Sequence, residues 1–222
     1  RAHPTAGAYG RQITGRYETP PPANFERIAC FLAVIDRGTR PFRYDQLDRW
    51  LFPAGAGLVV RKKAWIQSVP AQPALTGVSA TDLTGKGEDI ETLSYFRKQG
   101  WAIWHNPAMR IEHVIKRDRL TESYLLKLFK GVGISRYHTR TIRFSAWQKA
   151  SAILAYTLKD IGHLIIHRLK NCQHSASLVI TCERTLLYYS ILSPFYHFKS
   201  LVSNLASKLF SRKVRPLQVD SS

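Results

Sequence analysis

The sequence predicts an α/β protein with a mixed sheet, followed by a region of helices. Two observations predict the sheet: Leu58–Val60 is a β-branched apolar run bounded by turn residues, and residues alternate in a strand-like manner from Trp101 onward. Between them, apolar residues recur at helical spacing from Ile90 to Phe96. After residue 121 only helical spacing recurs, so strands and helices give way to helices alone.

The basic residues are concentrated in the second part of the chain. The formal net charge is +18, and residues 119–222 hold 16 Lys and Arg against 4 Asp and Glu. We therefore divide the chain into a sheet-containing part, 1–120, a basic helical part, 121–213, and a polar tail, 214–222. The excess charge favours nucleic acid or the anionic cytoplasmic leaflet as a partner, and charge alone does not choose between them.

Composition limits the class of protein. At 222 residues, 45% of them hydrophobic, the chain can bury a real core, which argues against disorder. The three cysteines, Cys30, Cys172 and Cys182, are odd in number and lack CxxC spacing. They indicate neither a disulfide scaffold nor a zinc site, and they favour a reducing compartment.

The segments before residue 52 have weaker patterns. Residues 1–24 are rich in Gly and Pro and predict a loop with one short strand from Tyr9 to Ile13. The apolar run within residues 24–34 suits a short buried helix or strand. Polar and aromatic residues 39–51 predict a surface loop.

The middle of the chain leads to an acidic pair. After the buried strand predicted at Leu58–Val60, Arg61–Lys63 opens a short helix that runs to Val69. Residues 70–87 contain several prolines and glycines and predict a long mobile loop, of a length that is often functional. This loop ends at Glu88-Asp89.

The acidic pair opens a predicted helix. Ile90, Leu93 and Phe96 recur at helical spacing, and acidic residues occupy the positive N-terminal turn. Gly100 supplies the left-handed residue that follows many helix C-termini.

Two strands are predicted after this helix. Alternation over Trp101–His105 predicts the first, a turn follows at Asn106-Pro107, and Met109–Ile115 predicts the second. We expect His113 to point out of the second strand.

The remaining patterns are helical. They predict helices from Thr121, with a break at Gly131 and Gly133, and at about 145–170, 178–192 and 198–210. No window reaches ~18 apolar residues free of charge, so we expect no membrane-spanning helix. The patterns also allow an amphipathic helix that lies in the plane of a membrane.

Four short motifs occur in a fixed order. They are Gly55-Ala-Gly57, Glu88-Asp89, Gly100-Trp101 and His113. Their order and spacing resemble the second half of the catalytic domain of family 2 glycosyltransferases, which have the nucleotide-sugar-binding fold called GT-A. The amino-acid sequences of the segments Pro53–Arg61 and Gly100–Pro107 are most similar to those of cyanobacterial glycosyltransferases of hormogonium polysaccharide biosynthesis.

The resemblance implies a partial GT-A fold. The family begins with a nucleotide-binding strand and helix and an Asp-x-Asp metal motif, and the sequence has neither: Asp45 and Asp48 have the wrong spacing and Asp36 stands alone. We therefore expect a C-terminal portion without its N-terminal nucleotide-binding half, inactive by itself. No Gln-x-x-Arg-Trp motif of processive polymerases follows His113, which favours the addition of one sugar per encounter.

The resemblance also implies roles for individual residues. Inverting transfer needs a carboxylate that takes the proton of the acceptor hydroxyl, and Asp89 matches this base, with Glu88 assisting or positioning the acceptor. His113 matches the late ligand of a divalent ion, Mg²⁺ or Mn²⁺, at the diphosphate. The residues implied to contact substrate are Gly55, Ala56, Gly57, Gly87 and Trp101.

Plainer interpretations stay open. Adjacent acids at a helix start often complement the helix dipole, His113 could be an ordinary histidine of a sheet edge, and Gly55 and Gly57 could simply start a strand. His163 and His167 have a spacing that can bind metal, but a polar helix face explains them as well, because no third ligand is evident.

The implied partners are a nucleotide-sugar donor and a saccharide or lipid-linked acceptor. With the basic helices, this predicts a cytoplasmic enzyme that contacts the inner face of the plasma membrane peripherally. The rival function is a non-catalytic basic module that binds anionic membrane or nucleic acid. Nucleic acid is the less favoured partner, because it gives no reason for the motifs between residues 85 and 113.

Overall fold

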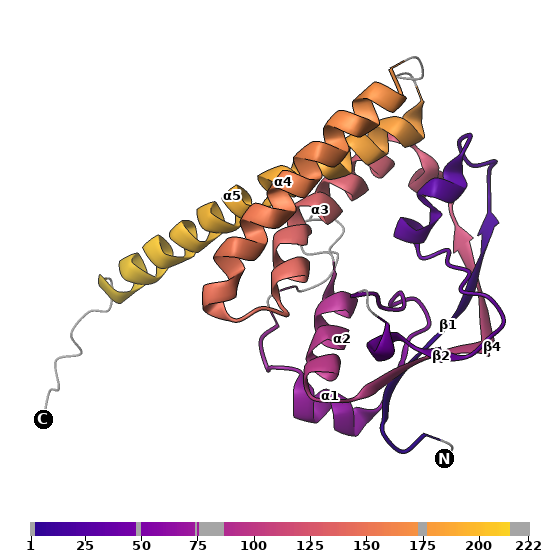
Figure 1. The fold of residues 1–222 in the computed structure, drawn as a ribbon, viewed down its shortest axis with the longest axis horizontal. Helices are drawn as coiled ribbons and strands as arrows, with labels where there is room; N and C mark the ends of the chain where they lie inside the picture. Colours follow the sequence, from indigo (N-terminus) through magenta and orange to yellow (C-terminus); the bar gives the residue numbers. More distant parts are fainter. Residues whose placement is uncertain (1–2, 48–49, 74, 76–86, 173–176, 214–222) are drawn as a thin grey trace, which may run out of the picture.

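The computed structural model describes residues 3–47, 50–73, 75, 87–172 and 177–213, and side chains up to residue 199. A four-stranded sheet with both parallel and antiparallel pairs lies beside a layer of long helices (Figure 1). The predicted α/β class, with a mixed sheet followed by helices, is confirmed. The predicted polar tail and most of the predicted loop at 70–87 lie outside the described residues.

Two parallel strands, β1 (Ala6–Tyr17) and β4 (Ala102–Ile115), form the centre of the sheet, whose order is β2-β4-β1-β3. The strand predicted from Tyr9 to Ile13 is confirmed and is longer than expected. Parallel neighbours need a long crossover. Here the connection contains the helices α1 (Lys62–Ser68) and α2 (Glu88–Lys98), and both predicted helices are confirmed.

The turn predicted at Asn106-Pro107 is wrong, because β4 continues through it as one strand. Arg11 faces Asn106 while the next residue, Gln12, faces Arg110, so three residues of β4 bulge out of the pairing. The Asn106 side chain accepts a hydrogen bond from the backbone amide two residues on, at 3.0 Å. Residues typical of a turn therefore form a bulge inside a strand.

Short antiparallel strands form both edges of the sheet: β2 (Phe42–Arg43) beside β4, and β3 (Val59–Val60) beside β1. The predicted strand at 58–60 is confirmed, but its predicted burial is wrong. Its two valines are 42% and 36% exposed, because an edge strand has a neighbour on one side only. The loop predicted at 39–51 contains β2 and a 3₁₀ turn, η3 (Tyr44–Gln46), whose tyrosine is buried.

Three helices follow the sheet: α3 (Glu122–Thr141), α4 (Ala146–Lys170) and α5 (Leu178–Lys213). The break predicted at Gly131 and Gly133 is wrong, because α3 runs through both. Gly133 instead allows close packing, since a Cβ there would lie 2.7 Å from the Cβ of a tyrosine on α5.

The helix predicted at about 145–170 is confirmed as α4, whereas the two helices predicted at 178–192 and 198–210 are one helix, α5, with Pro194 inside it. None of the helices in the described residues is both long and apolar enough to cross a bilayer.

The apolar run in residues 24–34 forms two 3₁₀ turns, η1 (Phe25–Arg27) and η2 (Ala29–Leu32). Their apolar side chains pack with α3 and α5 in one core, which therefore crosses the predicted boundary at residue 120. Its most deeply buried members are Ile28, Leu32, Ile115, Leu125, Leu128, Phe129, Val179 and Cys182. A second core joins the sheet to α1 and α2.

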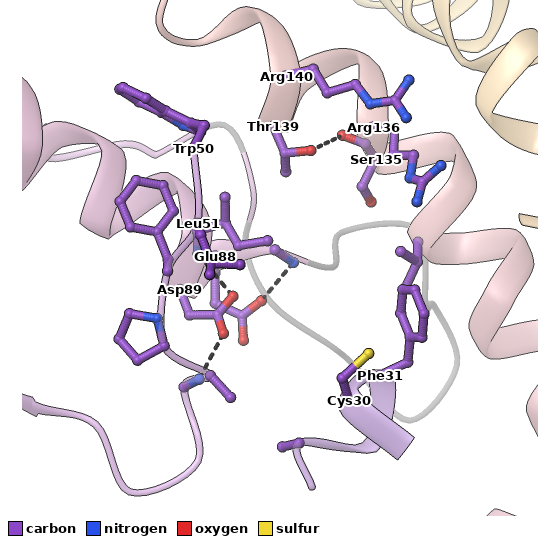
Figure 2. Close-up of a pocket in the computed structure, with 18 of the residues that line it drawn as sticks. Cys30, Phe31, Trp50, Leu51, Glu88, Asp89, Ser135, Arg136, Thr139 and Arg140 are labelled. Atoms are coloured by element: carbon purple, nitrogen blue, oxygen red, sulfur yellow. Dashed lines mark hydrogen bonds between the residues drawn. The ribbon is translucent and has the colours of Figure 1, made fainter. Parts of the chain in front are cut away.

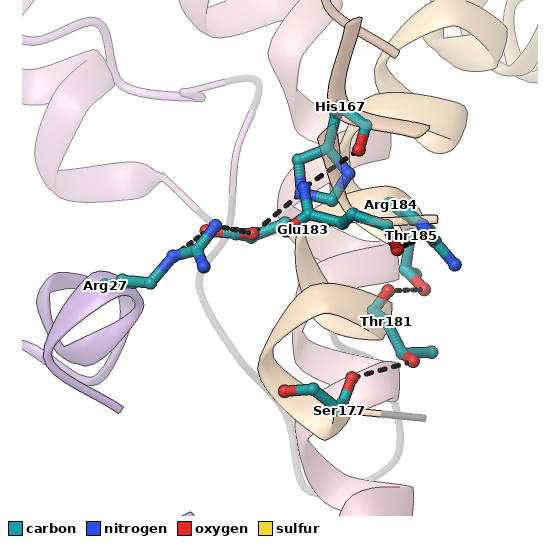
Figure 3. Close-up of polar contacts among 8 residues, drawn as sticks. Arg27, His167, Ser177, Thr181, Glu183, Arg184 and Thr185 are labelled. Atoms are coloured by element: carbon teal, nitrogen blue, oxygen red, sulfur yellow. Dashed lines mark hydrogen bonds and ion pairs between the residues drawn. The ribbon is translucent and has the colours of Figure 1, made fainter. Parts of the chain in front are cut away.

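An ionic contact reinforces the first core (Figure 3). Glu183 of α5 accepts two hydrogen bonds from Arg27 of η1, at 3.0 and 2.6 Å, and lies 2.8 Å from Nε2 of His167 on α4. The sheet-containing part and the helices are thus joined by charge as well as by apolar packing. His167 acts here as a structural contact, which agrees with the polar-face interpretation of His163 and His167.

Candidate active site

A cavity of about 820 Å³ lies between the N-terminus of α2, the segment 50–56, η2 and helix α3 (Figure 2). Five of the predicted site residues line it: Gly55, Ala56, Gly87, Glu88 and Asp89. The opposite wall comes from α3 and α4, far along the chain. The structure therefore brings the acidic pair and its glycines together in a space large enough for a small-molecule ligand.

Asp89 is held by backbone amides at both carboxylate oxygens. Oδ2 accepts the N–H of Gly55 at 2.7 Å, and Oδ1 accepts the N–H of Ile90 at 2.8 Å. Burial raises the pKa of Asp89 and the charge of Glu88 raises it further, while the backbone hydrogen bonds oppose the shift. A carboxylate with a raised pKa is a better proton acceptor than a free aspartate.

Two glycines fit this arrangement closely. A Cβ at Gly55 would lie 3.1 Å from both Cβ and Oδ2 of Asp89, so even a methyl group there would crowd the carboxylate. Gly87 precedes α2 with φ +106°, a conformation that side chains disfavour. Its amide lies 3.2 Å from Oε2 of the exposed Glu88.

The sequence analysis missed the group that holds α2 in place. Glu91 is fully buried: it accepts the amide N–H of Leu75 at 2.7 Å and the hydroxyl of Tyr95 at 3.0 Å, and lies 3.3 Å from Nε2 of His138 on α3. Burial and Glu91 raise the pKa of Tyr95 to about 12. The Glu91–Tyr95 spacing of one helical turn was visible in the sequence, whereas nothing there pointed to His138.

Arginines line the opposite wall of the cavity, and the sequence analysis missed them too. Arg136 and Arg140 lie on α3, Arg143 lies in the turn just after it, and Tyr156 of α4 also lines this wall. Arg140 forms a two-pronged ion pair with Asp160, at 2.5 and 3.1 Å, and Arg143 donates to the Tyr156 hydroxyl. Arg136 and Arg140 are one helical turn apart on α3, but only the fold sets them and Arg143 opposite Asp89.

Three predicted site residues are not among those that line the cavity. Gly57, with φ +67°, packs on the sheet, since a Cβ there would lie 2.6 Å from Cδ of Arg11. Trp101 packs on the second core, after Gly100, which has the predicted positive φ, +78°. His113 lies on β4.

His113 faces a cation rather than a carboxylate. Its Nε2 lies 3.2 Å from Nη1 of Arg119, and burial together with Arg119 lowers the pKa of the imidazole. Among the described residues, no group of three or more His, Cys, Asp or Glu side chains could hold a metal ion. His113 does not fit a divalent ion in this arrangement, because the Nε2 lone pair that would bind the metal faces the N–H of a cation.

Comparisons with protein-family models, curated protein sequences and solved structures found no match to this chain. The case for a function therefore depends on the geometry of the cavity and on the order of the motifs.

Proposed function

We propose that this chain is part of an inverting glycosyltransferase of the GT-A fold, acting in polysaccharide biosynthesis, with Asp89 as the general base. One observation carries the proposal: Gly55, Ala56, Gly87, Glu88 and Asp89 line one cavity. Four of them, Gly55, Ala56, Glu88 and Asp89, belong to the motifs on which the resemblance depends. A plain surface pair would need neither the two backbone hydrogen bonds to Asp89 nor a glycine against its carboxylate.

The proposed reaction is a single displacement. The acceptor hydroxyl gives its proton to a carboxylate oxygen of Asp89 as its lone pair attacks the anomeric carbon of the donor. The bond between that carbon and the diphosphate breaks, and the nucleoside diphosphate leaves with the electron pair. Each Asp89 oxygen accepts one backbone N–H in the structure, and a carboxylate oxygen has a second lone pair for the proton.

Glu88 has a different role in this proposal. It is exposed at the first turn of α2 and lies beside Asp89, so it suits a hydrogen bond to another acceptor hydroxyl. The Mg²⁺ or Mn²⁺ ion implied by the resemblance stays a prediction. No step is assigned to it, because His113 faces Arg119.

Asp89→Asn tests the proposal in the enzyme that contains this chain. We expect a loss of kcat/KM of about 10²–10⁴-fold, the usual contribution of general base catalysis. The measurement is transfer of radiolabelled sugar from UDP-, GDP- and dTDP-sugars into saccharide or lipid fractions, with folding checked by circular dichroism. Glu112→Gln, which removes an exposed carboxylate of β4, is the matched control. Undiminished transfer by folded Asp89→Asn would refute the assignment.

A second observation favours membrane contact as part of the function. Helix α4 exposes a stripe of large apolar side chains, with Trp147 79%, Leu158 60% and Leu169 71% exposed. The other members of this apolar stripe are Leu154, Ile161, Ile165 and Ile166. It runs for about 33 Å along the helix, at about 1.5 Å per residue.

Basic residues flank the apolar stripe. Lys159, Arg168 and Lys170 are exposed on α4, next to apolar side chains that the described part of the chain leaves uncovered. Apolar residues bordered by Lys and Arg are typical of helices that lie in an anionic membrane surface. We propose this occupant for the stripe, which would bring a lipid-linked acceptor to the enzyme at the inner face of the plasma membrane.

Vesicle flotation tests the membrane proposal. The wild-type chain should float with phosphatidylglycerol vesicles and not with phosphatidylcholine vesicles, and less so at high salt. Trp147→Glu combined with Leu158→Glu should abolish flotation, whereas Ile66→Glu, at an equally exposed apolar residue of α1, should not. A double variant that floats normally would refute the proposal. A dimeric wild type that the double variant turns into a monomer would assign the stripe to a second copy instead.

A further inference from the structure

The two walls of the cavity carry opposite charges. Glu88 and Asp89 stand at the N-terminus of α2, while Arg136 and Arg140 stand on α3 across the cavity (Figure 2). Arg143, in the turn just after α3, also lines the cavity. Among the described residues, the three guanidinium groups outnumber the one carboxylate that pairs with them, that of Asp160. Asp160 pairs with Arg140, and the described hydrogen-bond acceptors of the other two guanidinium groups are hydroxyl groups.

Arg136 is half-buried on α3. It donates a hydrogen bond from Nη1 to the hydroxyl of Ser190 on α5, at 3.1 Å. Burial and the charge of Arg140 lower the pKa of its guanidinium to about 10, and Asp160 only partly offsets this. A desolvated cation whose hydrogen-bond partner is neutral is stabilised when an anion binds beside it.

Arg143 is the most accessible of the three. It is exposed, donates to the Tyr156 hydroxyl, and lies over the ring of Trp50, with 5.6 Å between the guanidinium carbon and the ring centroid. Both aromatic residues also line the cavity. The nearby hydroxyls of Ser135 and Thr139 donate to carbonyls of their own helix, so guanidinium groups are the donors suited to a ligand on this wall.

We propose that the α3 wall binds a phosphate or diphosphate group, with Arg136 and Arg143 as its ligands and Arg140, held by Asp160, adding to the positive field. Guanidinium groups suit this role because their N–H groups match two phosphate oxygens at once. The proposal deepens the proposed function and rests on it for the identity of the substrate. The phosphoryl group belongs either to a prenyl-linked acceptor or to the nucleoside diphosphate of the donor.

Calorimetric titration of the whole chain with three soluble probes tests this site: inorganic pyrophosphate, geranyl diphosphate and UDP. Saturable binding of pyrophosphate is expected, and Arg143→Gln should weaken it by about tenfold or more, as for other hydrogen bonds to charged groups. Arg136→Lys should weaken it while keeping the charge. Geranyl diphosphate bound more tightly than UDP would assign the site to the acceptor, and the reverse order would assign it to the donor.

The net charge of +18 calls for a control, since any anion is attracted to such a chain. Arg168→Gln removes one exposed charge from α4, away from the residues that line the cavity, and should change the affinity less than twofold. Equal weakening by Arg168→Gln and Arg143→Gln, or no saturable binding of any probe, would overturn the proposal.

Asp89→Asn separates this inference from the proposed reaction. The variant should bind pyrophosphate at least as tightly as the wild type, because it removes a negative charge from the cavity. If the Asp89→Asn enzyme is active and binds pyrophosphate, the role of Asp89 as general base is refuted, whereas the proposed anion site is retained. An inactive one in a chain that binds no anion would refute only the anion site.

Discussion

The carboxylate wall and the arginine wall of the cavity are built in different ways. Asp89 is positioned by backbone groups: two amide N–H donors, a helix start and a glycine that leaves room for the carboxylate. The arginines are positioned by side chains from other helices, with Arg140 on Asp160 and Arg136 on Ser190. A wall that starts from a helix N-terminus and turn glycines leaves a pattern in the sequence, whereas a wall held by side chains of other helices does not.

The largest expected effect is on the arginine wall. Asp160→Ala leaves Arg140 without its carboxylate, and Arg140 and Arg136 then repel one another. Asp160 is almost fully buried, and its ion pair is two-pronged. Breaking such a pair costs about 3–5 kcal/mol of the free energy of unfolding, to be measured by urea denaturation.

Two further variants decide how to interpret that loss. Asp118→Ala removes an exposed carboxylate and should stay close to the wild type. Arg140→Met combined with Asp160→Leu removes both partners and should recover most of the stability. Stability unchanged in Asp160→Ala would mean that the α3 wall does not depend on this pair.

This contrast explains what the sequence could and could not predict. The helix beginning at Glu88 follows from capping rules that act over a few residues. The meeting of Gly55 with Asp89, 34 residues apart in the sequence, was expected only from the order of the motifs in the family that the sequence resembles. The turn predicted at Asn106-Pro107 was wrong because the same side chains suit a turn or a bulge. The long pairing of β4 with β1 favours the bulge. Strand pairing across the whole sheet has no local signal.

The break predicted in the helical region was wrong for the same reason. Gly133 indicates a break by local propensity, yet in α3 it is the residue that lets α5 approach. The facing of α3 toward the cavity, and with it the arginine wall, depends on that packing. The contact between Glu91 and His138, which joins the two walls, likewise links residues that no spacing rule pairs.

A smaller effect is expected on the carboxylate wall from Gly55→Ala. The added methyl group would lie 3.1 Å from Asp89, so the carboxylate must shift by a few tenths of an ångström while the backbone hydrogen bond stays available. We expect stability to change by about 1 kcal/mol or less and kcat/KM to fall by about tenfold, since catalysis depends on sub-ångström placement of the base.

Gly162→Ala on α4 is the matched control for that variant, because a Cβ there meets nothing within 4 Å. It should leave turnover unchanged. A Gly55→Ala enzyme as active as the wild type would show that the close approach of the loop to Asp89 is dispensable.

The smallest effect concerns the pH dependence of the proposed reaction. The base must be deprotonated, so kcat/KM should fall as the pH drops through the raised pKa of Asp89, above the ordinary aspartate value of about 3.9. Burial is the main cause of the raised pKa, and Glu88 contributes through its charge. Glu88→Gln should therefore move the acidic limb of the pH profile to lower pH.

The same profile tests whether the walls act separately. Among the described residues, Glu88 is the charged group that shifts the pKa of Asp89, and the arginines do not shift it. Arg143→Gln should therefore leave the acidic limb in place while it weakens anion binding, whereas Glu88→Gln should move the limb and leave anion binding at least as tight. If Arg143→Gln shifts the limb to higher pH, the guanidinium acts on Asp89 across the cavity, and the two walls form one electrostatic unit.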